Sequence, residues 1–93
     1  MRLNQQEINA IKQSVQALDT HAKIYLFGSR VDINKKGGDI DLLIFSQVLD
    51  YNDKLQIKRR LFEQIEEQKV DIIIAKDTTD PFVQIAFEQG ILL

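Results

Sequence analysis

Apolar residues recur along this chain with two different spacings, and each spacing predicts one kind of element. In residues 4–20 they lie three and four positions apart, as on one face of a helix. The residues of this face are Ile8, Ile11, Val15 and Leu18. Asn4 precedes the stretch and Glu7 lies three residues on, which is the arrangement of a capping box. The sequence therefore predicts an amphipathic helix that begins next to Asn4.

Three short apolar runs have the composition of β-strands. Residues 23–27 and 70–75 are rich in β-branched and aromatic side chains, which favour strands. Residues 39–45 begin with two acids and continue as Leu42-Leu43-Ile44-Phe45, which is apolar on both faces. This pattern is typical of a central strand that is covered on both sides.

Two further helices are predicted from caps and apolar stripes. Asp53 is a candidate N-cap for residues 54–68, and Asp80 followed by Pro81 is a candidate start for a last helix that Gly90 ends. The residues predicted to face the core are Leu55, Leu61, Phe62 and Ile65 in the first of these helices and Phe82, Ile85 and Ala86 in the second.

The order helix, strand, loop, strand, helix, strand, helix predicts an α/β (α+β) fold. We expect a small mixed sheet of three or slightly more strands covered by helices, formed as a single domain over residues 1–93. The relative direction of the first two strands stays open, because their connection is too long for a tight hairpin. The apolar tail 91–93 is predicted either to pack on the sheet or to belong to a partner interface.

Composition narrows the classes of function. The net charge is −2, which argues against direct nucleic-acid binding by bulk electrostatics. The basic run Lys58-Arg59-Arg60 is predicted to be a solvated helix face balanced by nearby glutamates. There is no cysteine, so disulfides and thiolate metal sites are excluded. No apolar run approaches the roughly 18–20 residues that span a bilayer, so a soluble cytoplasmic protein without a membrane partner is expected.

The first candidate for chemistry is the turn Gly28-Ser29-Arg30, which follows the first predicted strand. Glycine there lets a phosphate approach the backbone closely. A helical turn opened by Ser29 would aim N–H groups at an anion, and Arg30 could add a charge-assisted bond to phosphate. An ordinary strand-ending turn explains the same residues, so this motif alone does not decide.

Three aspartates form the second candidate. Asp39 and Asp41 are two residues apart at the start of a strand and therefore point to one face. Asp71 is a lone acid in the last predicted strand, and it joins them if that strand lies beside the second one. Solvent-facing acids are the simpler alternative. Carboxylates gathered at the edge of a core repel one another unless a cation compensates, and such oxygen ligands suit Mg²⁺.

Taken together, these motifs resemble a known superfamily. Leu26-Phe27-Gly28-Ser29-Arg30, nine further residues, Asp39-Ile40-Asp41-Leu42 and the later Asp71 resemble the DNA polymerase beta-type nucleotidyltransferases. The chain is most similar to the minimal nucleotidyltransferases of that superfamily in length and element order. Two positions depart from the usual pattern: Gly38 replaces a serine before the first acid, and Asp32 replaces a second arginine.

The resemblance implies a nucleotidyltransferase fold and a set of roles. Gly28, Ser29 and Arg30 would bind the triphosphate of ATP. Asp39, Asp41 and Asp71 would hold Mg²⁺ and act in catalysis, with Asp71 assisting the attacking hydroxyl.

The resemblance also implies a partner. Minimal nucleotidyltransferases are paired with HEPN-type ribonuclease toxins, and some act as antitoxins by transferring AMP to a tyrosine of the toxin. A non-catalytic antitoxin that only masks the toxin is one alternative, and transfer to a small molecule such as an aminoglycoside is another. Homo-oligomerisation stays open.

Overall fold

The computed structural model describes residues 1–35, 38–65 and 69–93. In chain order, these residues form α1 (Gln5–Gln16), β1 (Lys23–Phe27), the 3₁₀ helix η1 (Gly28–Val31), β2 (Ile40–Phe45), α2 (Tyr51–Gln64), β3 (Val70–Ala75), α3 (Pro81–Gln89) and β4 (Ile91–Leu92). The predicted α/β class and the three main strands are confirmed. No helix within the described ranges is both long enough and apolar enough to cross a membrane.

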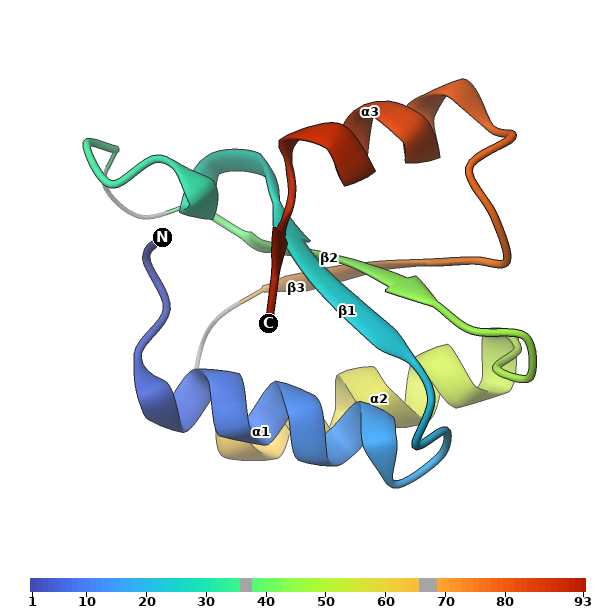
Figure 1. The fold of residues 1–93 in the computed structure, drawn as a ribbon. Helices are drawn as coiled ribbons and strands as arrows, with labels where there is room; N and C mark the ends of the chain where they lie inside the picture. The colour runs from blue at the N-terminus through green and yellow to red at the C-terminus, as the bar shows by residue number, and fades with distance from the viewer. Residues whose placement is uncertain (36–37, 66–68) are drawn as a thin grey trace.

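The strands form a mixed sheet in the order β3-β2-β1-β4 (Figure 1). The first two strands, β1 and β2, are antiparallel, which settles the direction that the sequence left open. The pair β2 and β3 is parallel, with α2 as the connection between them. The short β4 pairs with the outer side of β1, so the apolar tail packs on the sheet.

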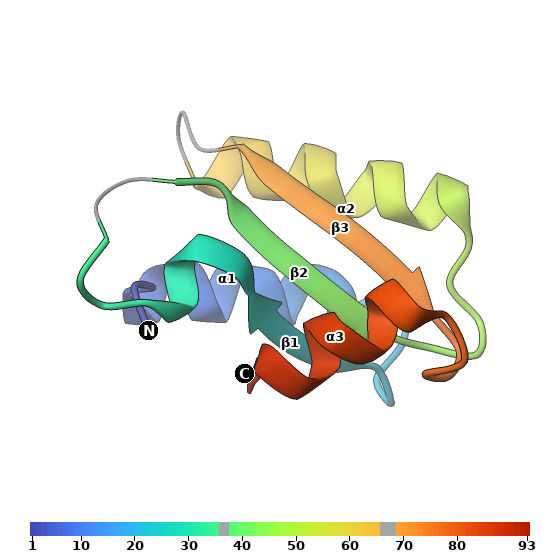
Figure 2. The ribbon, with the colours of Figure 1, turned by 90° about the horizontal axis from the view of Figure 1, so that it is seen from above.

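The two faces of the sheet are covered unequally. Helices α1 and α2 cover one face, where Ile40, Leu42 and Ile44 of β2 are fully buried (Figure 1). Helix α3 lies on the other face, where Val83 and Ala86 pack against Leu43. Figure 2 shows that α3 lies away from the first residues of β2 and β3. Helix α3 therefore does not cover that end of the sheet.

Capping residues set the helix starts largely as the sequence predicts. Asn4 caps α1, and its side chain and that of Glu7 form the predicted capping box. Asp80 caps α3, with Pro81 in the first turn. Helix α2 begins three residues earlier than predicted, because Asp50 is its N-cap and Asp53 completes the capping box. Residues 66–68, which the prediction assigned to this helix, lie outside the described residues.

Part of the predicted core of α2 is wrong. Leu61 and Ile65 are buried, but Leu55 is 42% exposed and Phe62 is 70% exposed. The residue that joins Leu61 in the core is Ile57, one that the sequence analysis passed over. Because each residue advances about 100° around a helix, Leu55 lies roughly opposite Ile57. The sheet contacts the Ile57 side of the helix.

The same error occurs on α3. Ala86 is buried as predicted, but Phe82 is 57% exposed and Ile85 is 53% exposed. Val83 is the second residue that faces the sheet. Ile85 lies about 200° from Val83 around the helix and therefore points outward. The first helix is also shorter than predicted, since α1 ends at Gln16.

Candidate functional site

The sheet brings two of the three candidate acids side by side. Asp41 of β2 and Asp71 of β3 are partners in the parallel register. Neighbouring strands lie about 4.8 Å apart, and residues in register point to the same face. Asp39 is two residues before Asp41 and shares that face. All three carboxylates therefore lie on the face of the sheet that packs against α3, next to the first residues of β2 and β3. Helix α3 does not extend to that end of the sheet (Figure 2).

The environment of Asp41 makes its negative charge costly. Burial is the largest cause that raises the pKa of this carboxyl above its usual range, followed by the charges of Asp71 and Asp39. The ammonium group of Lys69 acts in the opposite direction. Asp71 and Asp39 are thus close enough to oppose the ionisation of Asp41, which the simpler alternative of separate solvent-facing acids does not predict.

Lys69 is a cation of the chain itself, placed between two of these acids. Its Nζ lies 3.7 Å from Asp39 Oδ2 and 3.8 Å from Asp71 Oδ2. The three side chains are between 44% and 68% exposed, so solvent reaches these ion pairs. Sequence reasoning missed Lys69, although its position directly before β3 and two residues before Asp71 is the signal that could have identified it.

The Gly28 turn packs directly against the acids. Gly28 has φ +77°, and a Cβ at this position would overlap the carboxylate of Asp41. Gly38 has φ +91°, and a Cβ there would overlap the hydroxyl of Ser29. Both positions combine a left-handed backbone with a close approach, and only glycine meets the two conditions without strain. The turn and the acid-bearing strand are therefore in contact, as the triphosphate hypothesis requires.

Arg30 links the turn to two distant backbone carbonyls. Its Nε donates to the carbonyl of Gly38 at 3.1 Å, and its Nη1 donates to the carbonyl of Arg2 at 2.9 Å. These bonds fix the turn to the segment that leads into β2. The phosphate contact of Arg30 stays a prediction, and in the structure its guanidinium bonds backbone carbonyls.

Arg2 is a second arginine that supports the turn, and sequence reasoning missed it. Its Nη2 donates to the carbonyl of Ser29 and its Nε donates to the carbonyl of Asp32, both at 2.8 Å. Its backbone N–H donates to the carbonyl of Arg30 at 2.7 Å. No local signal announces these contacts, because they join residues 27 to 30 positions apart in the chain.

The donor set of the three aspartates fits a hard divalent cation. Carboxylate oxygens are the ligands that Mg²⁺ prefers, and the crowded charge at Asp41 is the kind that such an ion relieves. Among the described residues, however, no group of three histidine, cysteine or acidic side chains is already gathered closely enough to hold a metal ion. The side chains must therefore converge for a metal to be bound by all three.

Comparison with protein families agrees with this geometry. The family described as "Polymerase beta, Nucleotidyltransferase" matches residues 9–93. The chain belongs to this family. The match includes the Gly28 turn and all three aspartates, and it indicates nucleotidyl transfer in general, hence a transferase. Domains of this family usually use a divalent metal. A comparison with curated proteins found no match.

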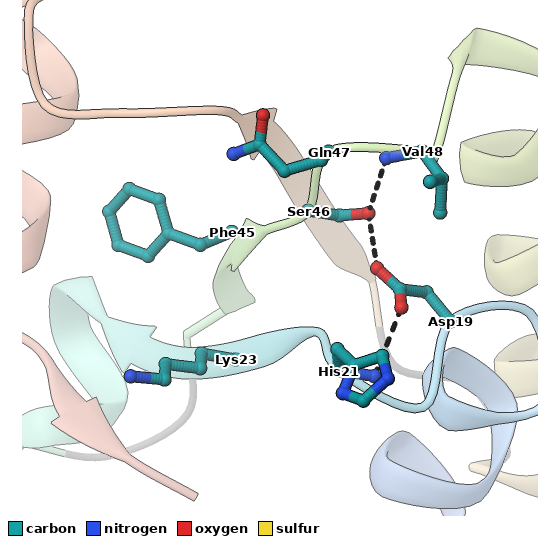
Figure 3. Close-up of a pocket in the computed structure, with 7 residues that line it drawn as sticks. All are labelled: Asp19, His21, Lys23, Phe45, Ser46, Gln47 and Val48. Atoms are coloured by element: carbon teal, nitrogen blue, oxygen red, sulfur yellow. Dashed lines mark hydrogen bonds between the residues drawn. The ribbon is translucent and has the colours of Figure 1, made fainter.

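A separate pocket of about 370 Å³ lies at the other end of β2 (Figure 3). Ser46 Oγ donates to Asp19 Oδ2 at 2.6 Å and accepts from the N–H of Val48 at 3.2 Å. The backbone N–H of His21 donates to Asp19 Oδ1 at 3.0 Å. The hydrogen bond from Ser46 is the main cause that lowers the pKa of Asp19.

This second constellation contains serine, histidine and aspartate but is not built for nucleophilic catalysis. His21 takes part through its backbone N–H, and its side chain is exposed. The hydroxyl of Ser46 donates to the acid and not to an imidazole. A nucleophilic serine needs a base that accepts its proton and a third group that orients the base. The contacts instead tie the end of α1 to the end of β2.

Proposed function

We propose that the protein is a Mg²⁺-dependent nucleotidyltransferase that transfers AMP from ATP to a hydroxyl group of a partner protein. The proposed acceptor is a tyrosine of a HEPN-type ribonuclease toxin, which makes this chain an antitoxin of the minimal nucleotidyltransferase type. The observation that carries the proposal is the pairing of Asp41 with Asp71 in register, beside a Gly28 turn that touches Asp41. Family membership supports the reaction class, and the resemblance described above supports the acceptor.

In this proposal, Asp39, Asp41 and Asp71 hold the metal. A bound divalent cation supplies charge neutralisation for the triphosphate and lowers the pKa of the attacking hydroxyl. The Gly28-Ser29 backbone receives the phosphates, because the missing side chain at Gly28 lets this backbone lie directly against the carboxylate of Asp41. Arg2 and Arg30 keep this backbone in position. Asp71 orients the acceptor hydroxyl for attack on the α-phosphorus, and pyrophosphate leaves.

A partner protein is favoured as acceptor by the way the described helices are used. Helices α1 and α2 cover one face of the sheet and α3 packs on the other (Figure 1). In the described parts of the chain, every helix is thus committed to the core of the sheet. The end of the sheet that α3 does not cover, beside Asp39 and Asp71, is where an acceptor from another molecule could enter.

The test uses the purified protein, ATP, Mg²⁺ and the HEPN-type protein encoded next to it. Intact-mass measurement should show AMP added to the partner by the wild type and no addition by Asp39→Ala/Asp41→Ala. Glu63→Ala/Glu88→Ala removes two exposed acids on other elements and is the matched control, which should transfer normally. Equal products from the wild type and the aspartate double variant would end the enzymatic proposal.

A non-catalytic antitoxin is the second candidate, because Lys69 already pairs with two of the acids and no metal group is assembled among the described side chains. In that case the chain neutralises its partner by covering it. Growth rescue by Asp39→Ala/Asp41→Ala at wild-type strength, in cells that express the partner, favours this candidate. Loss of rescue at unchanged binding favours transfer.

A further inference from the structure

Helix α2 carries a line of large apolar side chains that face solvent. Tyr51 is 67% exposed, Leu55 is 42% exposed and Phe62 is 70% exposed. At about 100° per residue, positions 51, 55 and 62 fall within roughly 40° of one another around the helix. Residues 51 and 62 are 11 positions apart in the helix, so at about 1.5 Å per residue the line is about 16 Å long. None of the three belongs to the core clusters. The sequence analysis assigned Leu55 and Phe62 to the core, but packing against the sheet uses neither side chain.

The flanks of this line are basic. Lys58 and Arg59 lie about 40° and 60° from its middle on opposite sides, and neither forms an ion pair with a described residue. The acids of this helix are Asp53 and Glu63, which lie about 180° and 100° away. We call Tyr51, Leu55, Lys58, Arg59 and Phe62 the α2 stripe. No described glutamate forms an ion pair with Lys58 or Arg59. Glu66 and Glu67 lie outside the described residues, so the predicted balance by glutamates stays a prediction.

The stripe adjoins the open edge of the sheet. Strand β3 is the last strand in the sheet order, and Figure 2 shows α2 running alongside it. A groove of about 270 Å³ lies between them, lined by Leu49, Asp50, Tyr51, Lys54 and Ile74. At its other end α2 reaches the side of the molecule where β2 and β3 begin (Figure 2). Asp39 directly precedes β2, and Asp71 is the second residue of β3.

We propose that the α2 stripe docks the acceptor protein through an amphipathic helix whose apolar side chains are flanked by Asp and Glu. This inference rests on the proposed function in taking the docked partner to be the acceptor. Three anchors spread over three turns match the helix-in-groove mode of recognition. Lys58 and Arg59, which form no ion pair with a described residue, select acidic flanks, because complementary charges guide association and like charges oppose it.

Charge also argues against a second copy of this chain as the occupant. A two-fold interface brings the same surface patch of both copies together. Two α2 stripes facing each other would oppose four cations, Lys58 and Arg59 from each copy, without an acid of the stripe between them. A partner with acidic flanks meets the same surface with attraction. Nucleic acid would use the cations but would leave the three apolar anchors without a matching surface.

The probes are two synthetic helical peptides with leucine at the same helical spacing, one flanked by Glu and the other by Lys. Fluorescence anisotropy at low salt should show at least tenfold tighter binding of the Glu-flanked peptide, with the preference falling as salt rises. Tyr51→Ser/Phe62→Ser should lose at least tenfold in affinity for it. The matched control Ile33→Ser/Ile85→Ser removes two equally exposed apolar side chains elsewhere and should bind normally. Circular dichroism should show both variants folded.

Three results would overturn the docking proposal. The first is equal affinity for the two peptides, and the second is an equal loss of affinity in the stripe variant and the control variant. The third is a sedimentation experiment in which the wild type is a dimer and Tyr51→Ser/Phe62→Ser is a monomer. Preferred binding of duplex RNA over the Glu-flanked peptide would likewise contradict it. The variant Asp39→Ala/Asp41→Ala should still bind the peptide. If the wild type binds the Glu-flanked peptide but transfers no AMP, the proposed reaction is contradicted and the docking proposal is not.

Discussion

Replacing Asp41 by asparagine should stabilise the metal-free protein while removing its metal binding. The side chain keeps its size, but its charge disappears from a position beside Asp71 and two residues from Asp39. Two like charges about 5 Å apart repel by about 0.8 kcal/mol in a water-like medium and by about 3 kcal/mol at an effective dielectric constant of about 20. Because Asp41 is only partly buried and Lys69 opposes the repulsion, we expect the lower end, about 1 kcal/mol. This corresponds to a rise in Tm of about 4–8 °C for a domain of this size.

The raised pKa of Asp41 determines the direction in which its charge changes the stability. A carboxyl whose pKa is raised in the folded state binds protons more tightly there than in the unfolded chain. Its contribution to stability is therefore complete at low pH, and it is lost as pH rises from the usual value of 3.8 through the raised value. At neutral pH the wild type carries the full cost of the ionised group. The Asp41→Asn variant carries none of it, so the difference in stability should grow over this acidic interval and then stay constant.

The assay is urea and thermal unfolding in EDTA at low salt, followed by circular dichroism from pH 4 to pH 8. Glu88→Gln removes an exposed charge on α3 and is the control, which should leave stability nearly unchanged. Adding Mg²⁺ should stabilise the wild type and leave Asp41→Asn unaffected. If Asp41→Asn is less stable than the wild type at neutral pH without metal, the reasoning about crowded charge is refuted.

Three further predictions follow from other contacts. Lys69→Met should lower the stability of the metal-free protein at low salt by about 0.2–1 kcal/mol for each ion pair lost. It should also raise Mg²⁺ affinity severalfold in calorimetric titration, because Lys69 competes with the metal for Asp39 and Asp71. Unchanged affinity would show that Lys69 and the metal do not compete. Gly28→Ala should lower stability by about 1–3 kcal/mol through backbone strain and should weaken ATP binding, measured by equilibrium dialysis. ATP binding at wild-type strength would show that the turn does not belong to the nucleotide site. Asp19→Ala should reduce stability through the lost bond to Ser46 without changing AMP transfer. Because the pKa of Asp19 is lowered, its contribution to stability is present above the usual value of 3.8 and is lost as pH falls through the lowered value. Unfolding curves of the variant should therefore lack this loss of stability at acidic pH.

Local signals account for the parts of the structure that sequence reasoning predicted correctly. Capping residues announce their own helix starts, as Asn4 and Asp80 do, because their partners lie two or three residues away. The spacing of Asp39 and Asp41 fixes their common face, since side chains alternate along a strand. These inferences need no knowledge of which strand lies beside which.

The remaining features depend on contacts between distant segments. Nothing in the sequence places Arg2 on the carbonyls of Ser29 and Asp32, because that contact requires β1 to end next to the N-terminal segment. The exposure of Phe62 was predicted wrongly for a related reason. The apolar pattern of α2 contains two stripes, and only the packed sheet decides that the Ile57 stripe is inside.

The central claim is that Asp39, Asp41 and Asp71 hold the metal of a bound nucleotide, and paramagnetic broadening by Mn²⁺ tests it most directly. Amide signals of isotope-labelled protein would be recorded with a non-hydrolysable ATP analogue and trace Mn²⁺. The account predicts that the signals of Ser29, Asp41 and Asp71 broaden first, that those around Ser46 at the far end of β2 persist, and that Asp39→Ala/Asp41→Ala abolishes the effect. Broadening centred elsewhere, or unchanged in the double variant, would contradict it.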